Sequence, residues 1–353
     1  MKILITGICG FAGNVIARGL AEQIPGARIF GIDNFSRRGS EGNRQPLQSL
    51  GIDVRTGDIR FPEDLASLGK ADWVIDCAAN PSVLAGLDGA VGPRDLLDHN
   101  LVGTIHLLEY CRKNQAGFIL ISTSRVYSID RLAALPMNVS GGRFVLDPEP
   151  ALPHVTAEGI QEDFSTEPPL SLYGSSKKCS ELLALEYGLA FGFPVRINRC
   201  GVLAGAGQFG KADQGIFSYW LHSWAARRPL KYIGFEGTGN QVRDCLHPRD
   251  IVPLLVRQIG DPSHQVPAVQ NLSGGKDNAM SLSNLSHWCE AAFGRHPVQA
   301  ETKPRPFDVP WLILDSGRAA RDWDWRVQTP LDAILEEIKA HAIANPGWLE
   351  LTA

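Results

Sequence analysis

Several features that mark special classes of protein are missing from this chain of 353 residues. No apolar stretch approaches the roughly 18 residues of a membrane span. The apolar run at residues 1–6 is too short for a secretory signal and leads into glycines instead of a cleavage site. No block of lysine and arginine forms the basic stripe that a nucleic-acid backbone requires, and the formal net charge is −4. We therefore expect a cytoplasmic protein with neither a membrane nor a nucleic acid as its partner.

Cysteine pairs with the spacing of metal or redox sites are also missing. The seven cysteines stand at positions 9, 77, 111, 179, 200, 245 and 289, a scattered set with no C-x-x-C pair. This pattern argues against a disulfide framework and a metal site, and most of the thiols are expected to be small core residues. With 44% apolar and 20% charged residues, the composition is that of an ordinary globular protein. At this length we expect two lobes, or one large domain with an interwoven cap.

Short β-branched runs alternate with stretches of helical period through the first half of the chain. This alternation predicts an α/β fold, with a Rossmann-type doubly wound parallel sheet in residues 1–200 and a smaller C-terminal α/β substrate lobe in 201–353. A segment near 241–258 is expected to return to the first domain. The predicted strands are 2–6, 28–32, 52–56, 73–77, 118–122 and 194–198, and the predicted helices are 11–23, 94–115, 172–191, 249–259, 281–292 and 330–343.

A proline-rich stretch at residues 128–171 interrupts this pattern. Prolines at 136, 148, 150, 153, 168 and 169 break any regular period. We predict a long surface loop there, which is either functional or a simple insertion.

A glycine-rich turn follows the first predicted strand and opens the first predicted helix. Gly7 permits the tight turn, Gly10 lets the backbone approach a pyrophosphate, and Gly13 allows close helix packing. Asp33 stands 20 residues after Gly13, where a carboxylate accepts the ribose hydroxyls and disfavours a 2′-phosphate. The sequence therefore predicts a site for NAD.

Residues near the ends of the following strands extend this site. Arg37 and the arginine after it could pair with a 2′-phosphate, so NADP stays open as an alternative. The pair Asp58 and Ile59 stands where an adenine edge would pass, and the pair Ala78 and Ala79 stands beside the expected pyrophosphate. Ordinary strand-end residues would also explain these two pairs.

Three side chains in two separate segments form a candidate catalytic site. Tyr173 and Lys177 lie four residues apart on a predicted helix, so that a cation close to the phenol lowers the tyrosine pKa and lets it act as a general base. Thr123 ends the fifth predicted strand, at the edge where open α/β sheets bind ligands, and its hydroxyl can share the same substrate oxygen. A solvated Tyr-Lys pair and a self-satisfied Ser/Thr strand end are the structural alternatives.

Together these residues resemble the extended short-chain dehydrogenase/reductase family of nucleotide-sugar enzymes over essentially the whole chain. The resemblance is carried by the T-G-x-x-G-F-x-G loop, by residues 100–104, by the Thr123, Tyr173 and Lys177 set, by 241–250 and by 305–308. Within the family, 33–39, 207–209, 213–215 and 239–244 resemble the enzymes that invert carbon 2 of a CDP-sugar.

The resemblance implies a set of contacts and a homodimer formed through the helices 94–115 and 172–191. Further cofactor contacts are implied at Cys9, Phe11, Asn34, Ser36, Arg37, Asn100, Ser122 and Arg199, and substrate contacts at Ser124, Arg125, Gln208, Gln214, Arg243 and Arg305, with no metal. The two last arginines are expected to grip a diphosphate.

One departure from the family narrows the chemistry. Members that dehydrate sugars carry Asp-Glu after the catalytic threonine, whereas this chain has Ser124-Arg125. We therefore expect an NAD-dependent sugar epimerase acting at carbon 2. A 4-epimerase or a reductase or dehydrogenase on the same site is the alternative, and an NAD-sensing regulator without turnover is a remote one.

Overall fold

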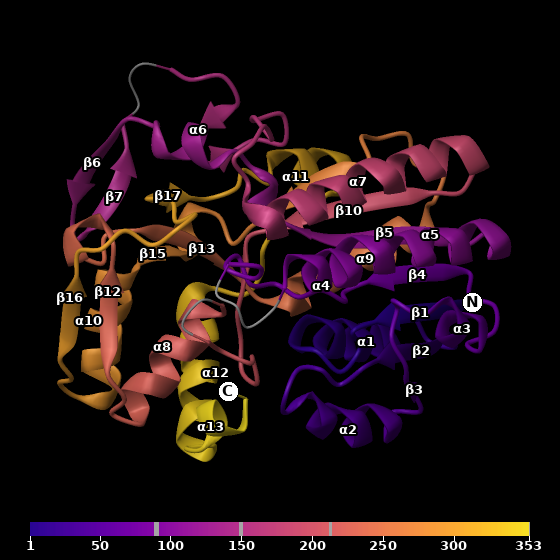
Figure 1. Cartoon of the computed structure of the whole chain (residues 1–353), viewed down its shortest axis with the longest axis horizontal. Coiled ribbons are helices and arrows are strands. Elements are labelled where there is room, and N and C mark those ends of the chain that lie inside the picture. Colours follow the sequence, from indigo (N-terminus) through magenta and orange to yellow (C-terminus); the bar gives the residue numbers. More distant parts are fainter. Residues whose placement is uncertain (88–91, 148–150, 212–213, 353) are drawn as a thin grey trace.

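The computed structural model describes residues 1–87, 92–147, 151–211 and 214–352. Its largest element is a parallel sheet of seven strands in the order β14-β10-β5-β4-β1-β2-β3 (Figure 1). The strand order reverses between β1 and β4, as in a doubly wound sheet, so the predicted architecture is confirmed. The strands are β1 (Lys2–Thr6), β2 (Arg28–Asp33), β3 (Asp53–Thr56), β4 (Trp73–Asp76), β5 (Gly117–Thr123), β10 (Val195–Cys200) and β14 (Val269–Leu272).

Helices cover both faces of this sheet. One face packs on α1 (Phe11–Gln23), α9 (Val252–Gly260) and α11 (Gly317–Trp323). The other packs on α3 (Pro62–Ala66), α5 (Gly103–Asn114) and α7 (Ser171–Phe191). The helix predicted at 94–115 consists of α4 (Pro93–Leu97), the π turn η2 (Asp98–Val102) and α5.

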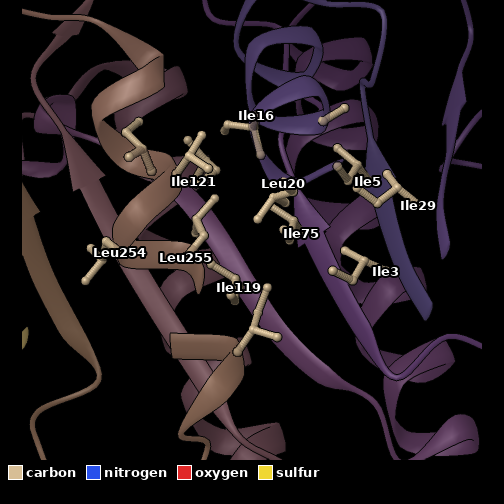
Figure 2. Close-up of a cluster of buried hydrophobic side chains, with 14 of the residues drawn as sticks. Ile3, Ile5, Ile16, Leu20, Ile29, Ile75, Ile119, Ile121, Leu254 and Leu255 are labelled. Atoms are coloured by element: carbon tan, nitrogen blue, oxygen red, sulfur yellow. The ribbon is translucent and has the colours of Figure 1, made fainter. Parts of the chain in front are cut away.

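The alternation of strand side chains explains how the sheet holds both layers. Ile3 and Ile5 of β1 point to one face and meet Ile16 and Leu20 of α1, which are four residues apart on the helix (Figure 2). Leu4, between the two isoleucines, is buried on the other face. Full burial of such a side chain contributes roughly 1.5–3 kcal/mol, so each layer is fixed by the strand pattern itself.

The second lobe has its own small sheet and helices. The segment expected to return near 241–258 divides, because β13 (Val242–Leu246) joins the small sheet while α9 packs on the large one. The strand that returns to the large sheet is β14, and the domain boundaries 1–200 and 201–353 stay a prediction.

The remaining elements of both lobes complete the fold. They are β11 (Val202–Leu203), β12 (Leu230–Ile233), β15 (Ala279–Ser281), β16 (Val298–Glu301), β17 (Trp311–Leu312), α2 (Arg44–Gln48), α8 (Ile216–Ala225), α10 (Leu282–Phe293), α12 (Leu331–Ala344) and α13 (Trp348–Leu351), with short helices η1 (Ser40–Asn43), η3 (Ser124–Val126), η4 (Phe235–Gly237), η5 (Pro248–Ile251) and η6 (Lys276–Asn278).

The prediction of a structureless loop at 128–171 is wrong. The segment holds α6 (Ile129–Ala133), the hairpin β6 (Met137–Ser140) with β7 (Arg143–Leu146), and the pair β8 (Val155–Thr156) with β9 (Gly159–Ile160). Its buried apolar side chains form one cluster with β17. The elements are too short to show a period between the prolines. Positions 148–150, which include two of those prolines, lie outside the described residues. So does position 213, the first of the segment 213–215 on which the family resemblance partly rests.

Within the described residues, no helix is both long and apolar enough to cross a membrane. The same part of the chain holds no group of three or more His, Cys, Asp or Glu side chains arranged to bind a metal. All seven cysteines are free thiols.

Candidate active site

Two cavities meet at two side chains of the predicted catalytic set. The first has a volume of about 330 Å³ and lies at the carboxyl ends of the large-sheet strands. The second has a volume of about 190 Å³ and lies toward the small sheet. Thr123 at the end of β5 and Tyr173 in the first turn of α7 line both cavities. A hydroxyl and a phenol therefore stand between two spaces that can hold two ligands.

The glycine turn forms a cradle that would be filled by a single added carbon. Gly7 has φ +58, and a Cβ at Gly13 would lie 2.2 Å from the Gly7 carbonyl oxygen. Gly10 is the N-cap of α1 and no side chain caps this helix end, so the first backbone N–H groups face the cavity. Such a helix end fits a pyrophosphate. The cradle thus fits the phosphate bridge of NAD.

Two carboxylates mark the nucleoside end of the first cavity. Asp33 accepts hydrogen bonds from the backbone N–H groups of Cys9 (2.8 Å) and Phe35 (2.9 Å), and burial raises its pKa. Burial also opposes ionisation of Asp58, but hydrogen bonds from Arg60 and Asn34 outweigh it and lower the pKa of Asp58 to about 2. Both groups lie on the cavity wall, as do the predicted residues Phe11, Asn34, Ser36, Arg37, Ile59, Ala78, Ala79 and Ser122.

Arg37, one of the two arginines that kept NADP open, is held by the second lobe. Its guanidinium donates to the carbonyl of Phe209 and, at 3.2 Å, to the side chain of Gln214. The Phe209 ring stacks on Trp348 of α13 at 5.6 Å. Because these contacts occupy Arg37, the wall of the first cavity fits NAD better than a 2′-phosphorylated nucleotide.

The catalytic set is brought together, although the predicted electrostatics are wrong in direction. Burial raises the pKa of Tyr173, against a hydrogen bond from Thr123 and the positive charge of Arg125. The sequence predicted a lowered pKa with Lys177 as the cation. Lys177 is buried one helical turn after Tyr173 and lines only the first cavity, so its ammonium faces the cofactor side.

A neutral thiol borders the same cavity. Burial raises the pKa of Cys200 to about 12, so the group stays protonated. His247 accepts a hydrogen bond from the Arg249 backbone N–H at 3.1 Å, and burial lowers its pKa to about 4. Neither side chain supplies a base.

The second cavity is rich in arginine. Arg243 of β13 forms an ion pair with Asp308 at 2.6 Å, and Arg305 and Arg125 line the same wall. Burial lowers the pKa of Arg125 to about 10, and the charge of Arg243 acts in the same direction. Ser124 and Gln214 also line this cavity. Several cations near one carboxylate favour an anionic ligand such as a diphosphate.

Four predicted contacts do not lie where the sequence placed them. The Arg199 guanidinium is buried in an ion pair with Glu181 (2.7 Å), because the neighbouring helix presents a carboxylate to the strand end. Asn100 binds Asn80 and α7 through its amide, the Cys9 side chain points into the core, and neither side chain lines a cavity. Gln208 lines the first cavity instead of the second.

Sequence reasoning missed several residues of the walls, and two of them, Asp308 and His99, are ionisable. Asp308 orients Arg243 and follows three residues after Arg305, so the 305–308 segment contained the signal. His99, which was not among the predicted site residues, lines the first cavity from the π turn η2.

The comparisons with known proteins agree with this geometry. The sequence pattern of the NAD dependent epimerase/dehydratase family matches residues 3–272. CDP-paratose 2-epimerase of Salmonella typhi is 30% identical over 81% of this chain and 82% of its own. UDP-glucose 4-epimerase of Corynebacterium glutamicum is 26% identical over 98% of this chain and 96% of its own. A solved structure of UDP-glucuronic acid 4-epimerase from Bacillus cereus with UDP-glucuronic acid and NAD superposes with a TM-score of 0.78 at 23% identity, covering 98% of this chain and 99% of that one.

The chain therefore belongs to the NAD dependent epimerase/dehydratase family. This membership confirms the predicted family, the enzyme class and NAD as the cofactor. The individual site residues stay predictions, and their geometry carries the proposals that follow.

Proposed function

We propose that this chain is a nucleotide-sugar epimerase that inverts carbon 2, with CDP-paratose as the first substrate to test. The observation that carries the proposal is the meeting of a dinucleotide cavity and an arginine-rich cavity at Thr123 and Tyr173. Carbon 2 is supported by the similarity to CDP-paratose 2-epimerase. Ser124-Arg125, in place of an acid pair, supports epimerisation over dehydration.

The charge of the second cavity supports a nucleoside diphosphate as the handle of the substrate. Arg125, Arg243 and Arg305 carry three positive charges against one on Asp308. The two phosphates of a sugar nucleotide balance the remaining charge in a wall where burial strengthens ion pairing. A neutral sugar then extends toward Thr123 and Tyr173.

The residues of the chain divide the chemistry between them. Gly7, Gly10, Gly13 and Asp33 would hold the dinucleotide, and Lys177 would bind near its nicotinamide ribose. The chemistry that bound NAD would supply there is reversible hydride transfer with the sugar carbon.

Proton transfer falls to the two side chains that both cavities share. Tyr173 takes the proton of the hydroxyl at the same carbon as that carbon becomes a ketone, and gives the proton back when the alcohol reforms. Thr123 hydrogen-bonds the same oxygen and keeps the proton path short.

A 4-epimerase is the second candidate, because UDP-glucose 4-epimerase of Corynebacterium glutamicum matches nearly the whole chain. A reductase or dehydrogenase would use the same three side chains. Regiochemistry follows from how the sugar is turned in the second cavity, which the catalytic set does not encode.

The test is incubation of the holoenzyme with CDP-, UDP-, GDP- and dTDP-sugars in deuterated water, followed by NMR of the products. Inversion at carbon 2 without deuterium in the product supports the proposal. Inversion at carbon 4 supports the second candidate, and deuterium uptake at carbon would show enolisation instead. Absence of conversion of every sugar would leave a protein that binds NAD without turnover.

A variant pair tests the base. Tyr173→Phe is expected to lose roughly 100- to 10,000-fold in turnover while it keeps its NAD. Tyr187→Phe is the matched control, because that phenol lies on the same helix and donates to Glu109 at 3.0 Å, away from both cavities. An unaltered rate in Tyr173→Phe would remove Tyr173 from the mechanism.

We also propose a homodimer through α5 and α7. Leu182 and Leu189 of α7 are exposed (52% and 81%), an unusual position for large apolar side chains on a helix of this length. Light scattering should give twice the chain mass, and Leu189→Glu should shift the protein toward the monomer. A native protein of single chain mass would refute the dimer.

A further inference from the structure

One arginine beside the catalytic pair, counted so far only for its charge, has no part in the proposed proton transfer. Arg243 is paired with the Asp308 carboxylate, whereas Arg125 donates to the backbone carbonyl of Phe307 at 3.3 Å. Arg125 lines the second cavity together with Thr123 and Tyr173. It therefore places a cation at the sugar end of the cavity.

The short turn η3 holds Arg125 in this place. Its backbone N–H donates to the Thr123 hydroxyl oxygen at 3.2 Å. Its carbonyl oxygen lies where a Cβ on Gly174 would approach it to 2.3 Å, so η3 packs directly on the first turn of α7. Because Gly174 follows Tyr173, the arginine and the phenol are fixed to one another by close backbone packing.

Four groups face the Tyr173 phenol from the elements around it. Thr123 of β5 lowers the pKa of the phenol through a hydrogen bond, Cys200 of β10 is a neutral thiol, and Lys177 lies one turn further along α7. The positive charge that lowers the pKa of the phenol belongs to Arg125, and the phenol in turn raises the pKa of Arg125. Both side chains line the second cavity, so the charge and the phenol share one buried space.

We propose that Arg125 is a positioning residue of the proton-transfer step, whose guanidinium lines the same cavity as Tyr173 and favours the phenolate formed when the sugar proton leaves. This role rests on the proposed function and adds to it a second cation beside Lys177. Lys177 then serves the cofactor side of the phenol and Arg125 the sugar side. The carbonyl of Phe307 accepts a hydrogen bond from the guanidinium at 3.3 Å and holds it on the wall of the second cavity.

The first test needs no substrate. A fluorotyrosine at position 173, in the NAD-loaded protein, reports ionisation of that one phenol by fluorine NMR, and its ring fluorine lowers the pKa into a convenient range. Arg125→Gln keeps a donor for the Phe307 carbonyl and removes the charge, and should raise the phenol pKa by about one unit. Arg125→Lys should restore most of that shift. Arg131→Gln, an exposed arginine on α6, is the control.

An unchanged titration in Arg125→Gln overturns the proposal. If Arg125→Gln fails to fold, as near-ultraviolet circular dichroism would show, the Arg125→Lys titration decides between a charge effect and a purely steric one. A lysine variant that titrates about one unit above the native protein would then contradict the charge effect.

The second test uses turnover. The acid limb of the kcat profile should move to higher pH by about one unit in Arg125→Gln, while the NAD content stays that of the native protein. A raised KM with an unmoved pH profile would make Arg125 a substrate anchor and would overturn the role proposed here. Because the fluorine titration is independent of the sugar, failure to find a substrate would affect the proposed function alone.

Discussion

The two cavities are built in different ways. The first is formed by consecutive βα units, in which the turn after β1, the ends of β2 and β3 and the ends of β4 and β5 follow one another along the chain. The second is assembled from η3, the start of α8, β13 and the 305–308 segment. Recognition in the first depends on space left by missing side chains, and in the second on charge. A cofactor shared by a family fits the first pattern, and a substrate that differs between relatives fits the second.

The largest expected effect tests the first cavity, where recognition depends on space left by missing side chains. Gly13→Val places side-chain atoms against the Gly7 carbonyl, which a Cβ alone would approach to 2.2 Å. NAD should be lost on purification, with affinity reduced at least about 100-fold, or about 2.7 kcal/mol. The measurement is the NAD content of the purified protein. Gly42→Ala is the control, because nothing lies within 4 Å of its added Cβ; equal NAD loss in both variants would contradict the cradle.

Removal of a charge tests the other half. Arg243→Ala removes a charge-assisted contact worth roughly 1.5–3 kcal/mol, so nucleoside diphosphates should bind about 10- to 100-fold more weakly. Titration calorimetry with CDP and UDP measures the change, and the NAD content should stay native. Arg112→Ala removes an arginine that is equally ion-paired, to Glu109 at 2.7 Å, but exposed on α5. If Arg243→Ala lowered the NAD content as well as the affinity for CDP, the two cavities would not bind their ligands independently.

The same comparison explains what the sequence could and could not predict. The glycine turn, Asp33 and Thr123 are local patterns at strand ends, and the chain places them on the cavity wall as expected. Arg199 also stands at a strand end, yet Glu181 takes its side chain into the core. That pairing depends on packing between α7 and β10, which no local spacing encodes.

The sequence did not predict the short elements, for a related reason. The strand β14 has four residues and the hairpins of 128–171 have two to four in each strand. At this length an alternating pattern does not differ from a loop, and only pairing with distant strands defines the element. Ile160, for example, is buried beside Leu314, with which it forms an isolated β-bridge, although the two residues are far apart in the sequence.

A smaller expected effect is a pH dependence of the unfolding free energy that arises in the second lobe. His222 of α8 contacts His341 of α12 at 3.0 Å, and burial lowers the pKa of His222 from 6.5 to about 4. The folded state thus favours the neutral ring, so stability is present above pH 6.5 and is lost as the pH falls toward 4. Between pH 7 and pH 5 this one group should cost about 2 kcal/mol of unfolding free energy.

The pH effect of His222 is measured by urea unfolding at the two pH values. His222→Gln should lose about 2 kcal/mol less than the native protein on acidification, whatever the absolute stability of the variant. His287→Gln, which removes an exposed histidine of α10, should keep the native pH dependence. Parallel pH curves for His222→Gln and the native protein would exclude the buried pair as the source.

The smallest expected effect concerns the one place where the first cavity departs from its local construction. Trp348, the first residue of α13, stacks on Phe209. Its indole N–H donates to the carbonyl of Gln208 at 2.9 Å. Gln208, Phe209 and Arg37 all line the first cavity, and Arg37 is bound to Phe209. The C-terminal helix therefore holds the wall that the second lobe contributes over the dinucleotide.

Removal of that indole should loosen the wall without altering the cradle. An aromatic pair contributes about 0.5–1.5 kcal/mol beyond its buried area, so Trp348→Ala should release NAD roughly two- to tenfold faster. The measurement is the NAD retained with time after dilution. Trp288→Ala removes an indole of the same lobe that faces Lys339 instead of the cavity and should leave the release rate unchanged. Faster release in Trp348→Ala alone would show that the βα units select NAD while the C-terminal helix slows its release. Equal release rates in the native protein and both variants would show that the βα units account for both selection and retention of NAD.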